Sequence, residues 1–338
     1  MNNFIQNNAS RLDWLLETTE PGAAYLATRD LLDLPQDDPG LLRLREKAHR
    51  SGPIAQVLSS MTDTGYWVEP GPGYLPKYFS TVWSLILLAQ LGADIQQDER
   101  IERACRYYLD QACSPGGIIS ASETPSGTAD CLQGNMCWAL TRLGFQDERL
   151  DVAYEWMARS VTGEGVAPMG QRDTERRYYG GNSGPLFACG ANDRQSCAWG
   201  GTKVMLAFAA LPPEKRTPLI ERAIQTGVDY MFRINPVTGE YPHPYSPKPS
   251  GNWWKFGFPV FYITDLLQLA EGLVGLGYAN DPRLADVHQL IREKQDSSGR
   301  WLLENGYQGK ITLDFGEKKA PSKWVTIRAL RVLKAVDN

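Results

Sequence analysis

Apolar residues along the chain follow two alternating patterns. In one pattern they recur every three or four positions behind an acidic or capping residue, and the segment ends in a Gly-rich bend. In the other pattern nearly every position is apolar. The first pattern predicts a helix with one buried face, and the second predicts a helix that is buried on all sides. The chain is therefore expected to alternate half-exposed outer helices with buried inner ones.

The outer segments are clearest at four places: Asp98–Ile118, Asp147–Val166, Thr217–Tyr241 and Asp281–Trp301. The inner segments lie between them and begin at Ser80, Ala129, Ser196, Val260 and Lys323. Helix pairs that recur roughly every 50–65 residues indicate a repeat array. Concentric packing of the two layers predicts an all-α fold, a closed α/α toroid with an outer and an inner ring of helices. We expect residues 1–338 to form this single domain, with N-terminal helices in residues 1–50 completing the ring.

Composition and charge narrow the choice of partners. The chain has 338 residues, a net charge of -4 and no block of Lys and Arg, so nucleic acid and anionic membranes are poor partner hypotheses. No apolar stretch is long enough for a transmembrane helix, and the first ten residues lack the pattern of a secretory signal. Six cysteines are too few for a disulfide framework at this length, so a cytoplasmic location is expected. A monomer or a weak homo-oligomer fits these features.

One short segment resembles a known repeat. Residues Gln295–Trp301 read Gln-Asp-Ser-Ser-Gly-Arg-Trp, which looks like the Q-x3-G-x-W motif of the terpenoid cyclase and protein prenyltransferase superfamily. Ser60–Trp67 and Gln111–Ile118 look like degraded copies, and the resemblance covers residues 50–338. It implies a toroid of about six helical hairpins around a central cavity. It also implies that the Gln caps an outer helix and that the aromatic residue packs between repeats.

The functional motifs of that superfamily are altered in this chain. Neither of the aspartate-rich motifs of the terpene cyclases is present. Prenyltransferases hold zinc with an Asp-x-Cys pair and a His, but here Asp130 and Cys131 are adjacent and Ile263 stands where that family has His. A prenyltransferase zinc site therefore cannot be transferred intact to this sequence.

In a toroid, the loops that lead into the inner helices meet at one mouth of the cavity. The long segments 167–195 and 235–255, rich in Gly, Pro and aromatic residues, are expected to lie there. An acid buried at such a mouth has a raised pKa and can donate a proton, and Asp265 and Asp130 are the candidates. Lys323 is a candidate for binding an anionic group of the substrate. The aromatic residues expected to shape the substrate are Trp83, Trp199, Trp254, Phe258, Tyr262 and Trp324.

Three functions remain open from the sequence. The leading hypothesis is an enzyme similar to terpenoid cyclases, a lyase or isomerase that starts cyclisation or isomerisation of a hydrophobic, isoprenoid-like molecule by protonation. The second is a zinc-thiolate enzyme, similar to prenyltransferases or lanthipeptide cyclases, in which Cys131, Cys197 and His243 hold zinc. The third is a non-catalytic module that binds a small molecule or peptide. Arg172, Arg176, Arg177 and Arg194 are candidates for an anion-binding rim.

Overall fold

The computed structural model describes residues 3–166, 181–243, 246 and 248–337, and the described chain is mostly helical with negligible sheet. The α-helices are α1 (Asn3–Asn7), α2 (Ala9–Leu15), α3 (Pro21–Leu31), α4 (Pro39–Arg50), α5 (Pro53–Ser59), α6 (Thr81–Gln90), α7 (Glu99–Ala112), α8 (Asp130–Arg142), α9 (Glu148–Thr162), α10 (Ala198–Ala210), α11 (Pro218–Met231), α12 (Leu266–Gly275), α13 (Ala285–Glu293) and α14 (Lys323–Asp337). Short 3-10 turns span Pro125–Gly127, Pro185–Phe187, Gly190–Asn192, Pro213–Lys215, Pro236–Thr238 and Pro282–Leu284.

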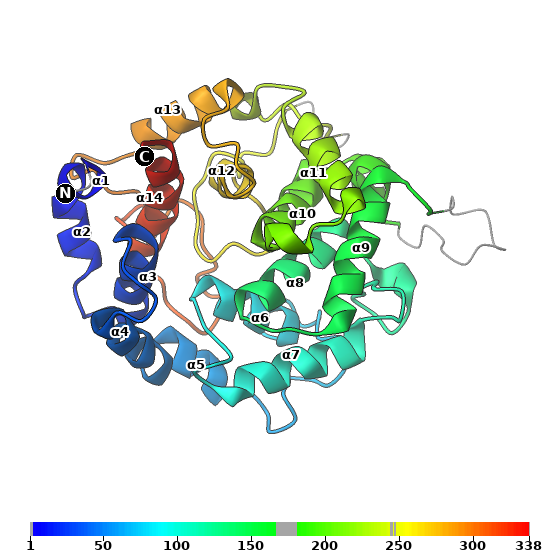
Figure 1. The fold of residues 1–338 in the computed structure, drawn as a ribbon, viewed down its shortest axis with the longest axis horizontal. Coiled ribbons are helices and arrows are strands. Elements are labelled where there is room, and N and C mark those ends of the chain that lie inside the picture. Colours follow the sequence, from blue (N-terminus) through cyan, green and yellow to red (C-terminus); the bar gives the residue numbers. More distant parts are fainter. Residues whose placement is uncertain (1–2, 167–180, 244–245, 247, 338) are drawn as a thin grey trace.

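The predicted alternation of helix types is present. Helices α7, α9, α11 and α13 lie along the edge of the molecule, and α6, α8, α10, α12 and α14 lie inward of them (Figure 1). The inward helices pack in succession, α6 on α8, α8 on α10, α10 on α12 and α12 on α14, and α14 also contacts α3. Nearly every residue of α6 and α10 is buried, whereas α7 buries one face only. The first and last parts of the chain are therefore in contact.

The edge helices begin where capping residues predict. The side chains of Asp98, Asp147 and Thr217 each accept a hydrogen bond from a backbone amide in the first turn of α7, α9 and α11. Asp281 does the same for the 3-10 turn that leads into α13. These bonds satisfy amide groups that have no partner within the helix. Acidic residues in the first turns of α7 and α9 add favourable interactions with the helix dipole.

The Gly-rich bends share one backbone geometry. The bends that follow α5, α7 and α13 contain Gly65, Gly117 and Gly299. The backbone N–H of each glycine donates to the carbonyl three residues earlier, and each glycine has a positive φ (108°, 81° and 72°). A Cβ added at Gly117 would lie 2.4 Å from the carbonyl oxygen of Val152 in α9. The absence of a side chain thus lets each bend approach the next segment closely.

Two of these bends end in a tryptophan that is held in the same way. The Trp301 indole donates to the Ile291 carbonyl (2.7 Å), and its backbone amide donates to Thr326 Oγ1 in α14 (3.1 Å). The Trp67 indole donates to the Val57 carbonyl (2.8 Å), and its amide donates to Thr81 Oγ1 in α6 (3.2 Å). Each tryptophan therefore joins the preceding helix to the following inward helix, and the degraded copy at Ser60–Trp67 has the geometry of the clear one.

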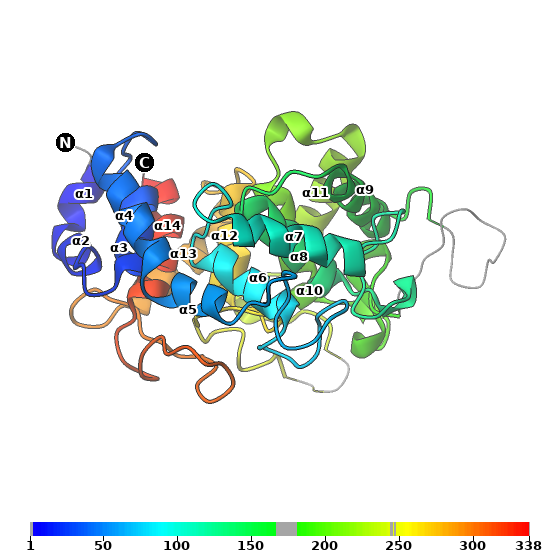
Figure 2. The ribbon, with the colours of Figure 1, turned by 90° about the horizontal axis from the view of Figure 1, so that it is seen from below.

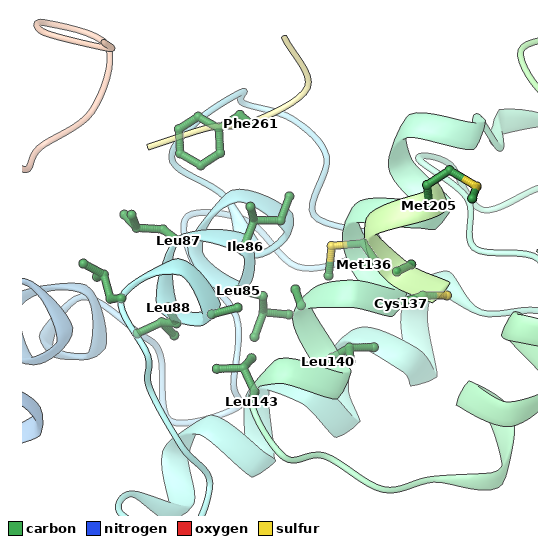
Figure 3. Close-up of a cluster of buried hydrophobic side chains, with 14 of the residues drawn as sticks. Leu85, Ile86, Leu87, Leu88, Met136, Cys137, Leu140, Leu143, Met205 and Phe261 are labelled. Atoms are coloured by element: carbon green, nitrogen blue, oxygen red, sulfur yellow. The ribbon is translucent and has the colours of Figure 1, made fainter. Parts of the chain in front are cut away.

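One part of the hydrophobic core lies between α6, α8 and α10. Figure 3 shows Leu85 and Ile86 of α6 facing Met136 and Leu140 of α8, with Met205 of α10 beside them. The backbones of α8 and α10 approach closely because Gly134 faces α10, where an added Cβ would lie 2.5 Å from the Lys203 carbonyl carbon. The two helices that begin at the candidate site are thus in tight contact.

The strands are short. Strands β1 (Ala188–Cys189) and β2 (Gln195–Ser196) form an antiparallel pair within a segment predicted as loop. Figure 2 shows that the long segments preceding α12 and α14 lie on the same side of the molecule.

Within the described residues, no helix has both the length and the apolar character needed to span a membrane.

Candidate functional site

A pocket of about 240 Å³ opens where α8 and α10 begin. Its walls come from the first turns of these two helices, from the β1–β2 hairpin and from the segment that precedes α12. Its lining includes a carboxyl group, thiols, amides and aromatic rings: Asp130, Cys131, Asn182, Cys189, Asn192, Cys197, Trp199, Tyr241, His243, Trp253 and Tyr262. The volume is that of roughly eight water molecules in the liquid, which suits a small ligand.

Asp130 is the carboxyl group of this pocket. It is the first residue of α8, its side chain is 2% exposed, and neither carboxyl oxygen has a hydrogen-bond partner among the described residues. Burial raises its pKa well above the ordinary value, and Cys189 adds to the rise, while the nearby backbone amide of Gly184 opposes it in part. Burial therefore favours the protonated form of Asp130, which can donate a proton into the pocket.

Three thiols lie beside this carboxyl group. The Cys189 thiol, at the end of β1, interacts by hydrogen bonding with the Cys197 thiol at the N-cap of α10. This bond, together with the backbone amides of Ala191 and Asn192, lowers the pKa of Cys189 to about 6 and raises that of Cys197. Burial raises the pKa of Cys131 to about 11. Cys189 is thus the one thiol of the three that is ionised near neutral pH.

Aromatic rings form the rest of the wall. The Trp253 indole N–H donates to the Pro236 carbonyl (2.8 Å), and the Tyr241 hydroxyl donates to the Met231 carbonyl (2.7 Å). Their polar atoms are thereby satisfied, and the ring faces are left for apolar contact. The Trp199 and Tyr262 rings meet edge to face at 6.3 Å. Such faces stabilise positive charge as well as apolar surface.

Asn192 connects two of the segments that make the pocket. Its side-chain amide donates to the carbonyl of Ser196 in β2 (3.2 Å) and to that of Pro242 (3.0 Å). The hairpin that carries Cys189 is therefore tied to the segment that carries Tyr241.

Asp265, the other predicted acid, lies outside this pocket and has a different role. It is the N-cap of α12 and accepts hydrogen bonds from the backbone amides of Gln268 (2.7 Å) and Gly257 (3.1 Å). Both of its oxygens also accept from the buried guanidinium of Arg328 at 3.0 Å. Its acceptor positions are occupied by the fold itself, so the geometry favours a structural role for Asp265.

The remaining predicted residues divide in the same way. Trp199 and Tyr262 line the pocket, whereas the other four predicted aromatic residues do not: Trp83, Trp254, Phe258 and Trp324. Phe258 and Trp324 stack on each other at 4.8 Å, and the indole N–H groups of Trp83 and Trp254 bind backbone carbonyls. Lys323 is buried and pairs with Glu17 at 3.1 Å. These residues hold helices and loops together.

The predicted zinc ligands Cys131, Cys197 and His243 all line the pocket. In the described part of the chain, however, no three His, Cys, Asp or Glu side chains are grouped so that they could hold a metal ion. Their arrangement therefore does not fit zinc, and no step is assigned to one. Of the predicted anion-binding rim, Arg172, Arg176 and Arg177 lie outside the described residues.

The sequence reasoning missed Cys189, Tyr241 and Trp253. Cys189 is followed by Gly-Ala-Asn-Asp, a turn composition, and then by a second cysteine across the turn. That pattern could have indicated a hairpin with two facing thiols.

Neither a protein-family model nor a curated protein matches this chain.

Proposed function

We propose that this protein is an enzyme that isomerises or cyclises a small, unsaturated, hydrophobic molecule, and that Asp130 supplies the initiating proton. The observation that carries the proposal is the Asp130 carboxyl group, buried without a hydrogen-bond partner among the described residues, in the wall of an aromatic pocket. A structural carboxyl group is normally paired, as Asp265 is. An unpaired buried acid beside an apolar pocket is typical of a catalytic site.

The proposal includes the closed α/α toroid predicted from the sequence. Two contacts between the ends of the chain support it. Helix α14 packs on α3, and a Cβ added at Gly299, in the bend after α13, would lie 2.5 Å from Nε of Arg11 in α2. Gly65 and Gly117 approach the backbones of α7 and α9, and Gly299 approaches the Arg11 side chain, so the last bend lies against the N-terminal helices as earlier bends lie against the next outer helix.

The chemistry follows from the two states of Asp130. The protonated carboxyl group donates its proton to one carbon of a double bond, forming a C–H bond and leaving a carbocation on the neighbouring carbon. The ring faces of Trp199, Tyr262 and Trp253 stabilise the cation while it rearranges. The Asp130 carboxylate then removes a proton from an adjacent carbon, which forms the new double bond and restores the acid. The reaction has no net consumption of protons or electrons.

Solvent deuterium provides the test. The purified protein is incubated with geraniol, nerol, linalool and limonene in deuterium oxide, and the products are analysed by mass spectrometry. Wild-type protein is expected to give isomeric or cyclic products that carry deuterium. Asp130→Asn, which keeps the size of the side chain but removes the acid, is expected to lower the rate roughly 100-fold or more.

Asp151→Asn is the matched control, because Asp151 is an exposed carboxylate on α9. It should leave the rate unchanged. A folded Asp130→Asn protein with the wild-type rate would exclude the acid role. If no probe reacts and no probe quenches the fluorescence of the pocket tryptophans, the proposed substrate class is contradicted.

A second candidate function, thiol chemistry, rests on the low pKa of Cys189. Iodoacetamide at pH 7 should label Cys189 roughly 50-fold faster than Cys113, a half-buried thiol whose pKa burial raises to about 11. Peptide mass spectrometry gives both rates in one sample. Cys197→Ala removes the hydrogen-bond partner and should slow the labelling of Cys189. Equal labelling of Cys189 and Cys113 would remove this candidate.

A further inference from the structure

A second cavity, of about 370 Å³, lies at the other ends of the inward helices. It shares no lining residue with the first pocket. Asp130 and Arg142 are the first and last residues of α8, and each lines one of the two cavities. A helix of 13 residues is roughly 20 Å long, so the two cavities are well separated. Helices α3, α6, α8, α10, α12 and α14 all contribute to the second one.

Four arginines line this cavity, and three of them are paired. Arg29 and Arg331 share the carboxylate of Asp30. Arg328 binds Glu271 (2.7 Å) and, behind the cavity wall, Asp265. The two carboxylates that line the cavity in the described part of the chain, Asp30 and Glu271, are thereby engaged with these three cations.

Arg142 is the fourth arginine. Its side chain is exposed to the cavity, and its guanidinium makes no hydrogen bond or ion pair with any described residue. The backbone carbonyls of Ala139 and Thr141 at the end of α8 do not need the guanidinium as a donor, because they accept hydrogen bonds from the backbone amides of Leu143 and Gly144. The positive charges of Arg29 and Arg331 repel Arg142, and Asp30, which is already paired with both of them, attracts it. The cavity thus contains a guanidinium whose N–H donors are not used by the described residues.

An apolar surface adjoins this charge. Trp138 lies one turn before Arg142 on the same face of α8 and also lines the cavity. The wall continues with Leu206, Phe258 and Val260. Val260 is fixed in place because its backbone N–H and carbonyl both bind the Gln90 side chain at 2.8 Å. A ligand that fits these walls has an anionic group at one end and an apolar body at the other.

We propose that this cavity binds a small organic anion, whose carboxylate or phosphate is held by Arg142 and whose apolar part lies against Trp138. A guanidinium presents a planar pair of N–H donors that matches both kinds of oxyanion. Arg29 and Arg331, which border Arg142, add to the attraction without giving up Asp30. The site is independent of the chemistry proposed for Asp130.

Four probes of equal chain length test the proposal by isothermal titration calorimetry at low salt. Octanoate and octyl phosphate carry the two anionic groups, octanol is neutral, and octylamine is cationic. At least one anion is expected to bind roughly tenfold or more tightly than octanol, since a charge-assisted hydrogen bond is lost with the alcohol. Octylamine is expected not to bind. The comparison of the two anions identifies the preferred group.

Arg142→Gln should abolish the preference for the anion over octanol, whereas Arg106→Gln, an exposed arginine on α7, should preserve it. Because Arg142 makes no bond within the fold, Arg142→Gln is expected to melt no lower than the wild type. Should that variant nevertheless unfold, Arg142→Lys keeps the charge and must keep a measurable preference. The proposal is overturned if the anions bind no better than octanol, or if Arg142→Gln binds them as tightly as the wild type.

Discussion

The guanidinium of Arg328 binds the carboxylate of Asp265 through two hydrogen bonds of 3.0 Å, and the pair is almost entirely shielded from solvent. The same guanidinium donates to the carbonyl of Gly257 (2.7 Å). The pair therefore joins α14 to the start of α12 and to the segment before it. Of the two carboxyl groups at inward helix starts, Asp265 is thus occupied by an arginine, whereas Asp130 has no hydrogen-bond partner among the described residues.

Breaking this pair should destabilise the protein strongly. Arg328→Met leaves the Asp265 carboxylate buried without its cation, and such a change typically costs about 3–5 kcal/mol of unfolding free energy. Urea denaturation followed by circular dichroism measures the loss. Arg222→Met, which breaks an exposed pair with Glu164, should lower the stability far less, because solvent screens that pair. Similar losses in the two variants would contradict the role assigned to Arg328.

Asp130 should make stability depend on pH in the opposite sense to a paired carboxylate. Its pKa is raised on folding, so above 3.8 the unfolded chain releases a proton that the folded chain retains. Folding stability is therefore lost as the pH rises, by about 1.4 kcal/mol per pH unit until the folded-state pKa is reached. Asp130→Asn should remove this loss. In urea titrations, the stability of the variant relative to the wild type should grow as the pH rises above 3.8. A constant difference would contradict a raised pKa.

The order and type of the helices could be predicted from the sequence because both depend on local signals. Asp98 and Asp147 mark helix starts by their own side-chain hydrogen bonds, and the buried pattern of α6 follows from its composition. The Gly-rich bends were recognisable because a positive φ at Gly117 and Gly299 favours glycine.

The site was only partly predictable because partners far apart in the chain decide each role. Asp130 and Asp265 both stand at the start of an apolar inward helix. Asp265 is paired by Arg328, 63 residues away, and a contact over that distance depends on the fold rather than on the local sequence pattern. Cys189 joins the pocket through a short hairpin within a segment that has no helical period.

Gly134 should be intolerant of a side chain. An added Cβ would lie 2.5 Å from the backbone of Lys203, so α8 and α10 would have to separate. Overpacking of this kind typically costs about 1–3 kcal/mol, which outweighs the gain that alanine usually brings to a helix. Gly251→Ala is the control, since nothing lies within 4 Å of its added Cβ. Thermal unfolding of the two variants should differ clearly, and an equally stable Gly134→Ala protein would contradict the close approach of the helices.

Lys203 should lower the stability of the protein at neutral pH. It is fully buried in α10, donates a hydrogen bond to Gln268 Oε1, and burial lowers its pKa from 10.5 to about 7. Below pH 7 both states are charged and the folded state bears the whole penalty, on the order of 5 kcal/mol. Between about 7 and 10.5 the unfolded chain binds the additional proton, so stability recovers as the pH rises. In urea titrations, Lys203→Met should therefore be more stable than the wild type at about pH 7. This advantage should shrink as the pH rises towards 10.5. An advantage that does not change with pH would mean that the lysine is not the group that titrates.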